Sequence, residues 1–293
     1  TILAHLLRRV LGVDMRLLAR SVNTLSALRS QQTSLWRRIV HFGIEALYKN
    51  ADHVIAQSHG MAQDLLDRYG FGKQDVTVIH NPVYHDFVAA AVQRCGREAG
   101  GDECFPFSGP EGTSRDTSIH EILFVGRLAP QKGLHRLLQA TKQLAQNRTD
   151  FVVRLVGQGP LREKLQAQVS RLQIESHVQF EGYQNKIIPY YSSATCTVLT
   201  SRFEGFPNVL VESITMGTPI VAFDCPSGPA EIVEEERNGY LVPEGDVDRF
   251  CEALQTTLDQ KWDPKSIQET AQRFNPSHIV DKYMDVVAGE VPS

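Results

Sequence analysis

The chain has 293 residues, of which 42% are hydrophobic and 22% are charged, and its formal net charge is −4 at pH 7. These proportions are typical of globular proteins and exclude a disordered or fibrous chain, and the length is enough for two domains of ordinary size. No stretch approaches 18 consecutive apolar residues, so no membrane-spanning helix is expected. The five cysteines form no CxxC pair, which disfavours a zinc site or a disulfide framework.

The charge is distributed unevenly. Residues 1–50 hold eight basic and two acidic side chains, a net charge of +6, which leaves −10 for the remainder of the chain. Such a segment can face a phosphate-rich partner or an anionic membrane surface, and it can equally be a solvated helix face. The scattered cysteines predict a reducing, cytoplasmic location. The basic segment is compatible with peripheral contact to the cytosolic face of a membrane. Because the chain starts with Thr1, we interpret its start as a truncation or a processed end.

Strands and helices alternate along the chain, which predicts an α/β fold with parallel sheets covered by helices. In the first part, strands are predicted near 14–20, 52–57 and 75–79, and helices near 33–49 and 60–69. The second of these helices is expected to end at Gly70, since glycine is the usual residue just after a helix. Three strands are fewer than a doubly wound domain usually has, so we expect this domain to be incomplete.

Residues 88–119 interrupt the pattern. They are rich in Gly, Pro, Ser, Thr and Asp and have no sustained apolar period, which indicates a flexible linker or insertion. We therefore place a partial N-terminal domain at 1–87 and the linker at 88–119.

From residue 120 onward the alternation is regular. Six strands are predicted, near 121–126, 151–156, 177–181, 195–200, 219–223 and 239–242. The helices between and after them are predicted near 133–146, 160–172, 185–193, 208–216, 229–235, 246–259, 264–273 and 276–287. This pattern predicts a complete doubly wound domain at 120–275, followed by a C-terminal helix and tail at 276–293.

In an open parallel sheet, ligands bind at the carboxyl ends of the strands, so the residues that follow each strand are the candidates. GRLAPQKG at 126–133 offers Gly126 for a tight turn, and its Arg127 and Lys132 are two cations suited to a diphosphate. Two incidental surface charges are the alternative interpretation. VGQGP at 156–160 is only half of a dinucleotide fingerprint, so a tight strand-to-helix turn is the preferred interpretation there.

SRFEGFPNVLVES at 201–213 is the most informative segment. Glu204 lies in the predicted loop and Glu212 lies in the predicted helix, where a carboxylate can accept hydrogen bonds from sugar hydroxyls. Asn208 is predicted to cap the helix, and the N–H groups of Val209 and Leu210 are predicted to be free for an anion. The alternative is that both glutamates only interact with the positive end of the helix.

A second Gly/Pro-rich turn, DCPSGPAE, occupies 224–231. The backbone of Ser227 or Gly228 could meet a ligand there, whereas Cys225 is interpreted as inert because no histidine is near it in the sequence. His59 and His80 follow predicted strands, and a loop or capping role is preferred for both over a role in a cleft.

The motifs GRLAPQKG, VGQGP, HVQFEGY, EGFPNVLVE and DCPSGPAEIV, in this order, resemble the C-terminal half of the retaining glycosyltransferases of family 4, which have the GT-B fold of two Rossmann-like domains. Glu204 and Glu212 match the Glu-x7-Glu signature of that family. A weaker resemblance covers 14–84, through ARSVNTLS, ADHVIAQS and VTVIHNP. The Gly-rich loop and the histidine of the family's N-terminal domain would precede Thr1. The resemblance therefore implies a truncated N-terminus, and no catalytic histidine is assigned.

The resemblance also implies a role for each matching residue. Arg127 and Lys132 would hold the donor diphosphate, Glu204 would meet the hydroxyls of the donor sugar, and these three are the predicted catalytic residues. Glu212 would bind the ribose of the donor. The other predicted donor-binding residues are Gly126, Gly182, Tyr183, Gly205, Phe206, Pro207, Asn208, Val209 and Leu210.

The implied reaction transfers a sugar from a nucleoside diphosphate, UDP in preference to GDP, to a glycan or lipid-linked acceptor with retention at the anomeric carbon. The resemblance places this reaction in polysaccharide biosynthesis and implies no metal, no cofactor and no nucleic-acid partner. One alternative is a binding fragment that takes up the nucleotide sugar without turnover. Another is a GT-B-like epimerase, which the Glu-x7-Glu spacing disfavours. A Rossmann oxidoreductase is disfavoured by the incomplete glycine pattern.

Overall fold

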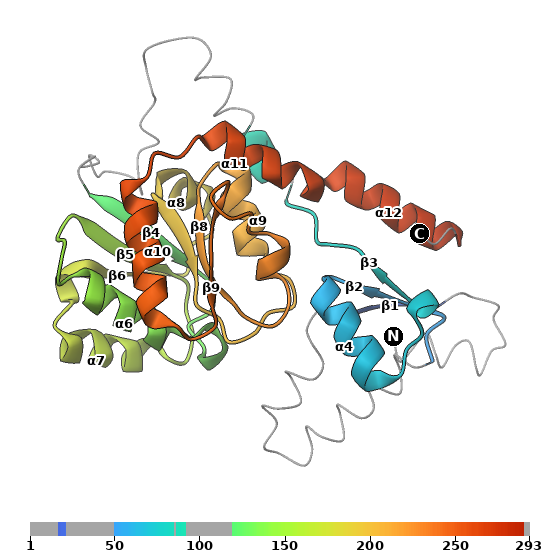
Figure 1. The fold of residues 1–293 in the computed structure, drawn as a ribbon, viewed down its shortest axis with the longest axis horizontal. Helices are drawn as coiled ribbons and strands as arrows, with labels where there is room; N and C mark the ends of the chain where they lie inside the picture. The colour runs from blue at the N-terminus through green and yellow to red at the C-terminus, as the bar shows by residue number, and fades with distance from the viewer. Residues whose placement is uncertain (1–16, 22–49, 85, 92–118, 290–293) are drawn as a thin grey trace, which may run out of the picture.

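The computed structural model describes residues 17–21, 50–84, 86–91 and 119–289. Two parallel sheets lie side by side in Figure 1, a three-stranded sheet with the order β1-β2-β3 and a six-stranded sheet with the order β6-β5-β4-β7-β8-β9. The predicted α/β fold with two Rossmann-like sheets is thus observed. The predicted helix at 33–49, most of the basic segment at 1–50 and most of the linker at 88–119 lie outside the described residues.

The first sheet consists of β1 (Leu18–Ser21), β2 (His53–Ala56) and β3 (Val76–Val78), and its strands are parallel. Helix α4 (His59–Tyr69) follows β2, and the hydroxyl of Ser58 accepts a hydrogen bond from the N–H of Met61 at the start of this helix. Gly70 ends the helix with a φ of 71°, a left-handed conformation that glycine adopts without strain. The predicted C-cap at Gly70 is therefore confirmed.

The second sheet is built from βα units, and all of its strand pairs are parallel. Its strands are β4 (His120–Val125), β5 (Phe151–Val156), β6 (Val178–Gly182), β7 (Cys196–Leu199), β8 (Ile220–Asp224) and β9 (Gly239–Pro243). The helices are α6 (Leu134–Leu144), α7 (Arg162–Leu172), α8 (Ile188–Ser193), α9 (Asn208–Thr215), α10 (Val247–Asp259), α11 (Pro264–Ala271) and α12 (Pro276–Ala288). The six strands predicted after residue 120 are all present.

The helix predicted at 229–235 is only a short 3₁₀ turn, Pro229–Glu231. An α-helix would need the carbonyl of Ile232 to accept a backbone N–H four residues later. Instead, this carbonyl accepts the side-chain amide of Asn238 at 3.0 Å and the guanidinium of Arg273 at 3.1 Å. The N–H of Val233 still donates to the carbonyl of Pro229 at 2.9 Å, and the side-chain partners of Ile232 then end the segment after this single turn.

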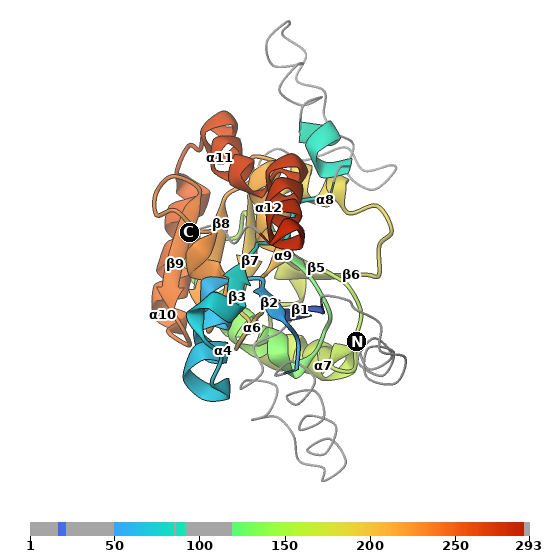
Figure 2. The same cartoon turned by 90° about the vertical axis from the view of Figure 1, so that its right-hand side faces the viewer.

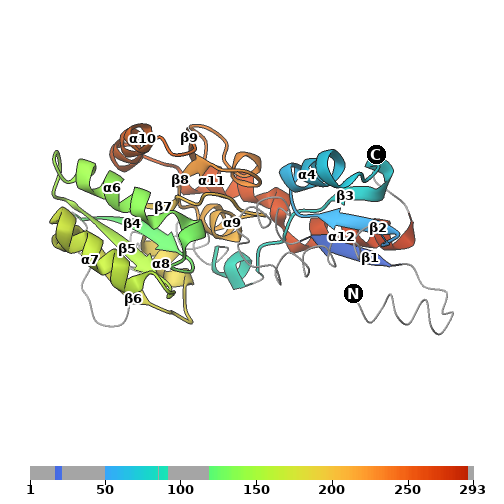
Figure 3. The same ribbon diagram turned by 90° about the horizontal axis from the view of Figure 1, so that it is seen from below.

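Helices cover both faces of the six-stranded sheet, as Figure 3 shows. Side chains alternate between the two faces along β4, so that Ile122 and Phe124 pack beneath α6, α7 and α10, while Leu123 packs beneath α8, α9 and α11. This alternation produces a hydrophobic core on each face. The sheet is thus buried on both sides, and its strand ends are the places where a ligand can reach it.

Helix α12 connects the two halves of the molecule. It follows the six-stranded sheet in the chain but lies along the three-stranded sheet (Figures 1 and 2), where Ile279 and Val286 share a buried cluster with Ile55 and Ile79. The N–H of Val83 also donates to the carbonyl of Phe274 at 3.0 Å. The last helix therefore holds the two halves against each other. Among the described residues, no helix is both long enough and apolar enough to cross a bilayer.

Candidate functional site

The strand order of the second sheet creates a switch point between β4 and β7. From β4 the chain continues on one side to β5 and β6, and then returns to the other side for β7, β8 and β9. The loops that follow β4 and β7 therefore leave the sheet in opposite directions from adjacent strand ends, which opens a crevice for a ligand. GRLAPQKG follows β4, and SRFEGFP follows β7. The sheet topology thus brings together the two motifs that the sequence had indicated.

These two loops contact each other closely. The hydroxyl of Thr200 donates to the carbonyl of Lys132 at 2.9 Å, and the N–H of Arg202 donates to the carbonyl of Gln131 at 2.8 Å. Gly133 ends the first loop with a φ of 61°, and a Cβ atom added to it would lie 2.1 Å from the carbonyl oxygen of Thr200. Only glycine fits at that position, which accounts for the last residue of the GRLAPQKG motif.

Lys132 and Glu204 meet at this contact. The ammonium of Lys132 lies 2.6 Å from Oε1 of Glu204, and both side chains are largely buried. The hydroxyl of Ser201 donates to the same oxygen at 2.5 Å. An ammonium has three N–H donors, and the bond to Glu204 uses one of them. Lys132 is thus held in one orientation and keeps donors for a further anion.

A cavity of about 930 Å³ lies beyond the carboxyl ends of β4, β5 and β6. It falls within the size range of small-molecule sites, and none of the described residues that line it has a carboxylate side chain. Its lining residues are Val125, Gly126, Arg127, Val156, Gly157, Gln158, Gly159, Pro160, Arg162, Tyr183, Gln184, Asn185 and Ile187. The cavity therefore suits an anionic ligand, because the charged side chains among its described lining residues are two arginines.

Three residues predicted for the site, Gly126, Arg127 and Tyr183, line this cavity. Arg127 is exposed and forms no ion pair with any residue that the structure describes. Tyr183 is 66% exposed, so its ring is open to a stacking partner. Gly182, which precedes it, has a φ of 71° and accepts the N–H of Gly157 at 2.7 Å through its carbonyl. The structure thus groups the residues predicted to border the base with one of the two predicted cations.

Lys132 lies at the edge of the same cavity. Its Cε atom is 3.6 Å from the position that a Cβ of Gly126 would occupy, so its side chain passes the cavity wall on the way to Glu204. The cavity and the Lys132–Glu204 pair are therefore adjacent.

The sequence interpretation missed Arg162 and gave Gly157 and Gly159 no role beyond a tight turn. A Cβ on Gly157 would lie 1.9 Å from the carbonyl oxygen of Gly126, and one on Gly159 would lie 2.4 Å from that of Leu128. These close approaches fit the interpretation as a turn, and both glycines also line the cavity. Arg162 is the first residue of α7, so a search for cations after β5 could have found it.

Glu212 lies inside α9 and is only 6% exposed. The hydroxyl of the fully buried Tyr191 donates to its Oε2 at 2.7 Å, a partner that the sequence did not indicate. Burial raises the pKa of Glu212, and the hydrogen bond from Tyr191 offsets only part of this rise. Burial, together with the adjacent carboxylate, raises the pKa of Tyr191 well above its usual value, so this phenol stays a hydrogen-bond donor.

Two expectations for the start of α9 are wrong. Asn208 is the first residue of the helix and does not cap it, because its side-chain oxygen accepts a hydrogen bond from the amide of Asn81 at 2.7 Å. The N–H of Leu210 is not free either, since it donates to the carbonyl of Pro207 at 2.9 Å. The N–H of Val209 has no hydrogen-bond partner among the residues that the structure describes and can still meet an anion.

The loop before α9 is buried at Gly205, Phe206 and Pro207. The ring of Phe206 stacks on His80, with 5.1 Å between the ring centroids, so this part of the predicted donor site also forms the contact between the two halves. Cys225, which follows β8, is also buried, and burial raises the pKa of its thiol. This fits the interpretation of this cysteine as inert.

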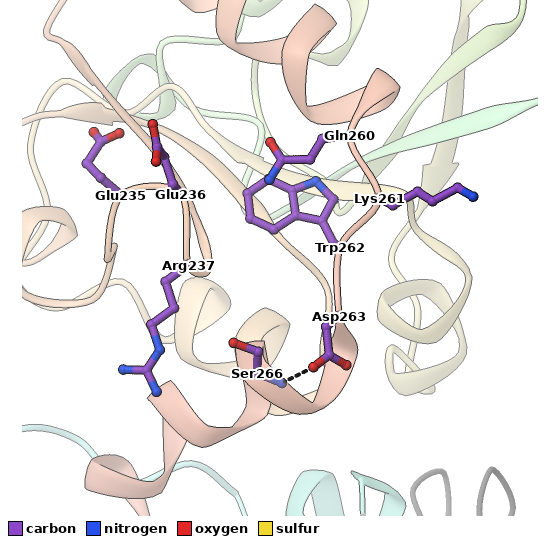
Figure 4. Close-up of a pocket in the computed structure, with 8 residues that line it drawn as sticks. All are labelled: Glu235, Glu236, Arg237, Gln260, Lys261, Trp262, Asp263 and Ser266. Carbon is purple, nitrogen blue, oxygen red and sulfur yellow. Dashed lines mark hydrogen bonds between the residues drawn. The ribbon is translucent and has the colours of Figure 1, made fainter.

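A second cavity, of about 410 Å³, lies elsewhere on the C-terminal half (Figure 4). Its lining residues are Glu235, Glu236, Arg237, Gln260, Lys261, Trp262, Asp263 and Ser266. Arg237 is already paired with Glu234 at 2.9 Å and with Glu269 at 3.3 Å. The remaining charged side chains of this cavity are the carboxylates Glu235, Glu236 and Asp263 and the ammonium of Lys261. This excess of negative charge disfavours a diphosphate, so the larger cavity at the switch point is the candidate site.

Comparisons with known proteins agree with this architecture. The chain is 34% identical over 138 residues to an uncharacterized glycosyltransferase of Haemophilus influenzae, a match that covers 47% of this chain and 39% of that protein. It is 29% identical over 230 residues to the lipopolysaccharide 1,6-galactosyltransferase of Salmonella typhimurium, with 76% of this chain and 58% of that protein covered. The chain thus spans about half the length of these curated relatives.

Solved structures resemble nearly the whole chain. The Anabaena protein HepE in complex with UDP and glucose matches with a TM-score of 0.75 and 22% identity, over 98% of this chain and 74% of that one. The apo form of the lipopolysaccharide outer core galactosyltransferase WaaB matches with a TM-score of 0.71 and 24% identity, over 99% and 72%. These likenesses confirm the GT-B type of α/β fold.

Two family models match the sequence. The model of Glycosyltransferase Family 4 matches residues 11–87, and the model of glycosyl transferases group 1 matches residues 112–274, which is more than half of the chain. The chain therefore belongs to the glycosyl transferases of group 1.

Proposed function

We propose that this chain binds a nucleoside diphosphate sugar at the switch point and transfers the sugar, with retention at the anomeric carbon, to a glycan or lipid-linked acceptor. One observation carries the proposal: Lys132 is fixed against Glu204 at the edge of a cavity that holds Arg127 and Arg162 and has no carboxylate among the lining residues that the structure describes. A cation for the phosphates and a carboxylate for the sugar thus lie side by side. The bond that breaks in such a donor is the one between its sugar and its diphosphate, so both groups lie next to the reacting bond.

Charge stabilisation is the main contribution that these residues can make. When the bond between sugar and phosphate breaks, negative charge develops on the departing nucleoside diphosphate, and cations already in place stabilise it without reorganisation. Arg127 and Lys132 are the proposed partners of the diphosphate. In a front-face reaction the departing phosphate itself takes the proton of the acceptor hydroxyl, so the protein mainly holds the reactants in position.

The two glutamates have separate proposed partners. Glu204 lies in the loop beside Lys132 and would accept hydrogen bonds from the hydroxyls of the donor sugar. Glu212, in α9, accepts a hydrogen bond from Tyr191 of α8 and would also accept hydrogen bonds from the ribose. A buried carboxylate gains from such donors, because they replace the water that burial has removed.

UDP is the proposed nucleotide, and the base would lie in the cavity beside Tyr183, where Gln184 and Asn185 offer amide groups to its polar edge. Support comes from HepE, whose structure was solved with UDP and glucose. The acceptor class rests on relatives named for lipopolysaccharide and for a diphospho-undecaprenol-linked acceptor, in Salmonella and in Campylobacter jejuni. That the transfer needs no metal, that the protein is cytoplasmic and that it contacts the membrane peripherally remain predictions.

Incubation with radiolabelled UDP-sugars and lipid-linked or lipopolysaccharide acceptors tests the proposal. We expect label in the acceptor, and we expect NMR of the product to give the anomeric configuration of the donor. An inverted product would contradict retention. Conversion of the free UDP-sugar to its epimer without any acceptor would favour an epimerase instead.

A further inference from the structure

Three potential metal ligands meet where the two halves touch, away from the cavity described above. His59 begins α4, His80 follows β3, and Glu231 lies in the 3₁₀ turn after β8. Their ligand atoms all lie within 4.8 Å of one another. We propose that this cluster binds one divalent transition-metal ion of the zinc type, which links the N-terminal half to the C-terminal half. This proposal is independent of the proposed function.

Two of the ligands are already fixed in place. Oε2 of Glu231 lies 2.9 Å from Nε2 of His80, and the carboxylate also accepts the N–H groups of His59 at 2.9 Å and Gly60 at 3.2 Å. The His80 ring is held by Phe206, on which it stacks. Outer contacts that orient metal ligands in this way raise the affinity of a site.

The spacing requires only a small adjustment. Ligands at about 2.0–2.1 Å from a tetrahedral zinc ion lie about 3.4 Å from one another. The ion would take the place of the proton that His80 and Glu231 share. His59 is exposed, so its side chain can turn toward the ion and leave the fourth position to water. Two imidazoles and one carboxylate suit zinc and its neighbours better than magnesium or calcium.

Binding has two further consequences. His59 and His80 belong to the N-terminal half and Glu231 to the C-terminal half, so an ion that needs all three stabilises the arrangement in which the halves touch. The imidazoles must also be neutral to act as ligands. Binding of the ion therefore displaces any proton that the ligating nitrogens carry.

Calorimetric titration of the metal-free chain with zinc chloride at pH 7.5 tests the site. We expect one tight ion per chain and no comparable binding of magnesium chloride. His59→Ala removes a ligand but keeps the backbone N–H that Glu231 accepts, and His80→Gln keeps a side-chain N–H for Glu231. Each variant should weaken zinc binding by at least about tenfold, the lower bound for losing even an outer partner of a metal ligand.

His278→Ala is the matched control, because His278 is an exposed histidine on α12 outside the cluster and its loss should leave the affinity unchanged. Thermal unfolding gives a second measurement, in which zinc should raise the Tm of the unaltered chain but not that of His59→Ala. No saturable binding of one zinc ion would overturn the proposal. It would also be overturned if zinc bound both cluster variants as tightly as the unaltered chain, or if zinc raised the Tm of His59→Ala equally.

Discussion

The ammonium of Lys132 contacts the carboxylate of Glu204 at 2.6 Å, although 72 positions separate them in the chain. The contact exists because β4 and β7 are neighbours in the sheet and the loop after each of them ends at the same crevice. A group suited to phosphate therefore touches a group suited to a sugar. Any substitution of Glu204 also changes the surroundings of Lys132, so the predictions below separate binding from reaction.

The two glutamates should respond differently to the same substitution. Glu212→Gln should weaken UDP binding by roughly 10- to 100-fold, which corresponds to the loss of hydrogen bonds to a charged group. Glu204→Gln should leave UDP binding nearly intact, because UDP lacks the sugar, and should lower kcat by about 100-fold through misplacement of the donor sugar. Calorimetry with UDP and a transfer assay measure the two effects. Equal loss of UDP affinity in both variants would contradict the separate roles, because it would show that Glu204 also supports binding of the diphosphate, through its contact with Lys132.

Tyr191→Phe should destabilise the fold and weaken UDP binding. The substitution leaves the buried carboxylate of Glu212 without the hydroxyl donor at 2.7 Å, which should cost about 1–3 kcal/mol of unfolding free energy. Without this hydrogen bond, the pKa of Glu212 should rise further.

Tyr190→Phe is the matched control, because Tyr190 lies in the same helix and its hydroxyl is 3.4 Å from Glu181, a long contact. Urea unfolding of both variants measures the difference. Equal stability of the two variants would mean that the hydrogen bond from Tyr191 to Glu212 contributes nothing to the free energy of unfolding.

Gly133→Ala should weaken UDP binding far more than Gly70→Ala. Both glycines have a positive φ, so each alanine should pay about 1–2 kcal/mol for the left-handed conformation. At Gly70 nothing lies within 4 Å of the added Cβ, whereas at Gly133 the carbonyl of Thr200 lies 2.1 Å away. Gly133→Ala must therefore displace the loop that carries Lys132. We expect it to lose UDP affinity while Gly70→Ala keeps it, and calorimetry that finds equal affinities would contradict this account of the loop.

Acid should remove the contribution of Glu231 to stability. Burial alone would raise the pKa of Glu231, but the hydrogen bonds from His80 and from the N–H groups of His59 and Gly60 outweigh it and lower the pKa. A carboxyl whose pKa is lowered in the folded state stabilises the fold above its unfolded value, here 4.5, and loses this contribution as the pH falls through the lower folded pKa.

Comparison with Glu231→Gln isolates this group. At pH 7 the variant should be less stable by about 1–3 kcal/mol, because a charged acceptor of hydrogen bonds is lost. Urea unfolding should show this gap unchanged down to about pH 4.5 and closing below it. A gap that stays constant down to pH 2 would contradict the assigned pKa direction.

Much of the C-terminal half could be predicted from the sequence, because its strands and helices alternate regularly and glycines directly follow β4 and β5, at Gly126 and Gly157. The pairing of Lys132 with Glu204 could not, since it depends on which strands become neighbours. Asn208 shows the same limit, because its local sequence favours a cap but Asn81, 127 positions away, takes up its side chain. The cluster of His59, His80 and Glu231 likewise depends on how the two halves meet.

Titration of the chain with UDP is the most direct test of the central claim, that the cavity at the switch point binds the donor. The unaltered chain should bind one UDP, and Arg127→Glu should weaken it by at least 10- to 100-fold, roughly the value of one charge-assisted hydrogen bond with repulsion added. Lys261→Glu, which makes the same charge change at the other cavity, should leave the affinity unchanged. If Lys261→Glu abolished binding while Arg127→Glu preserved it, the nucleotide would bind at the second cavity and the assignment of the donor site would be wrong.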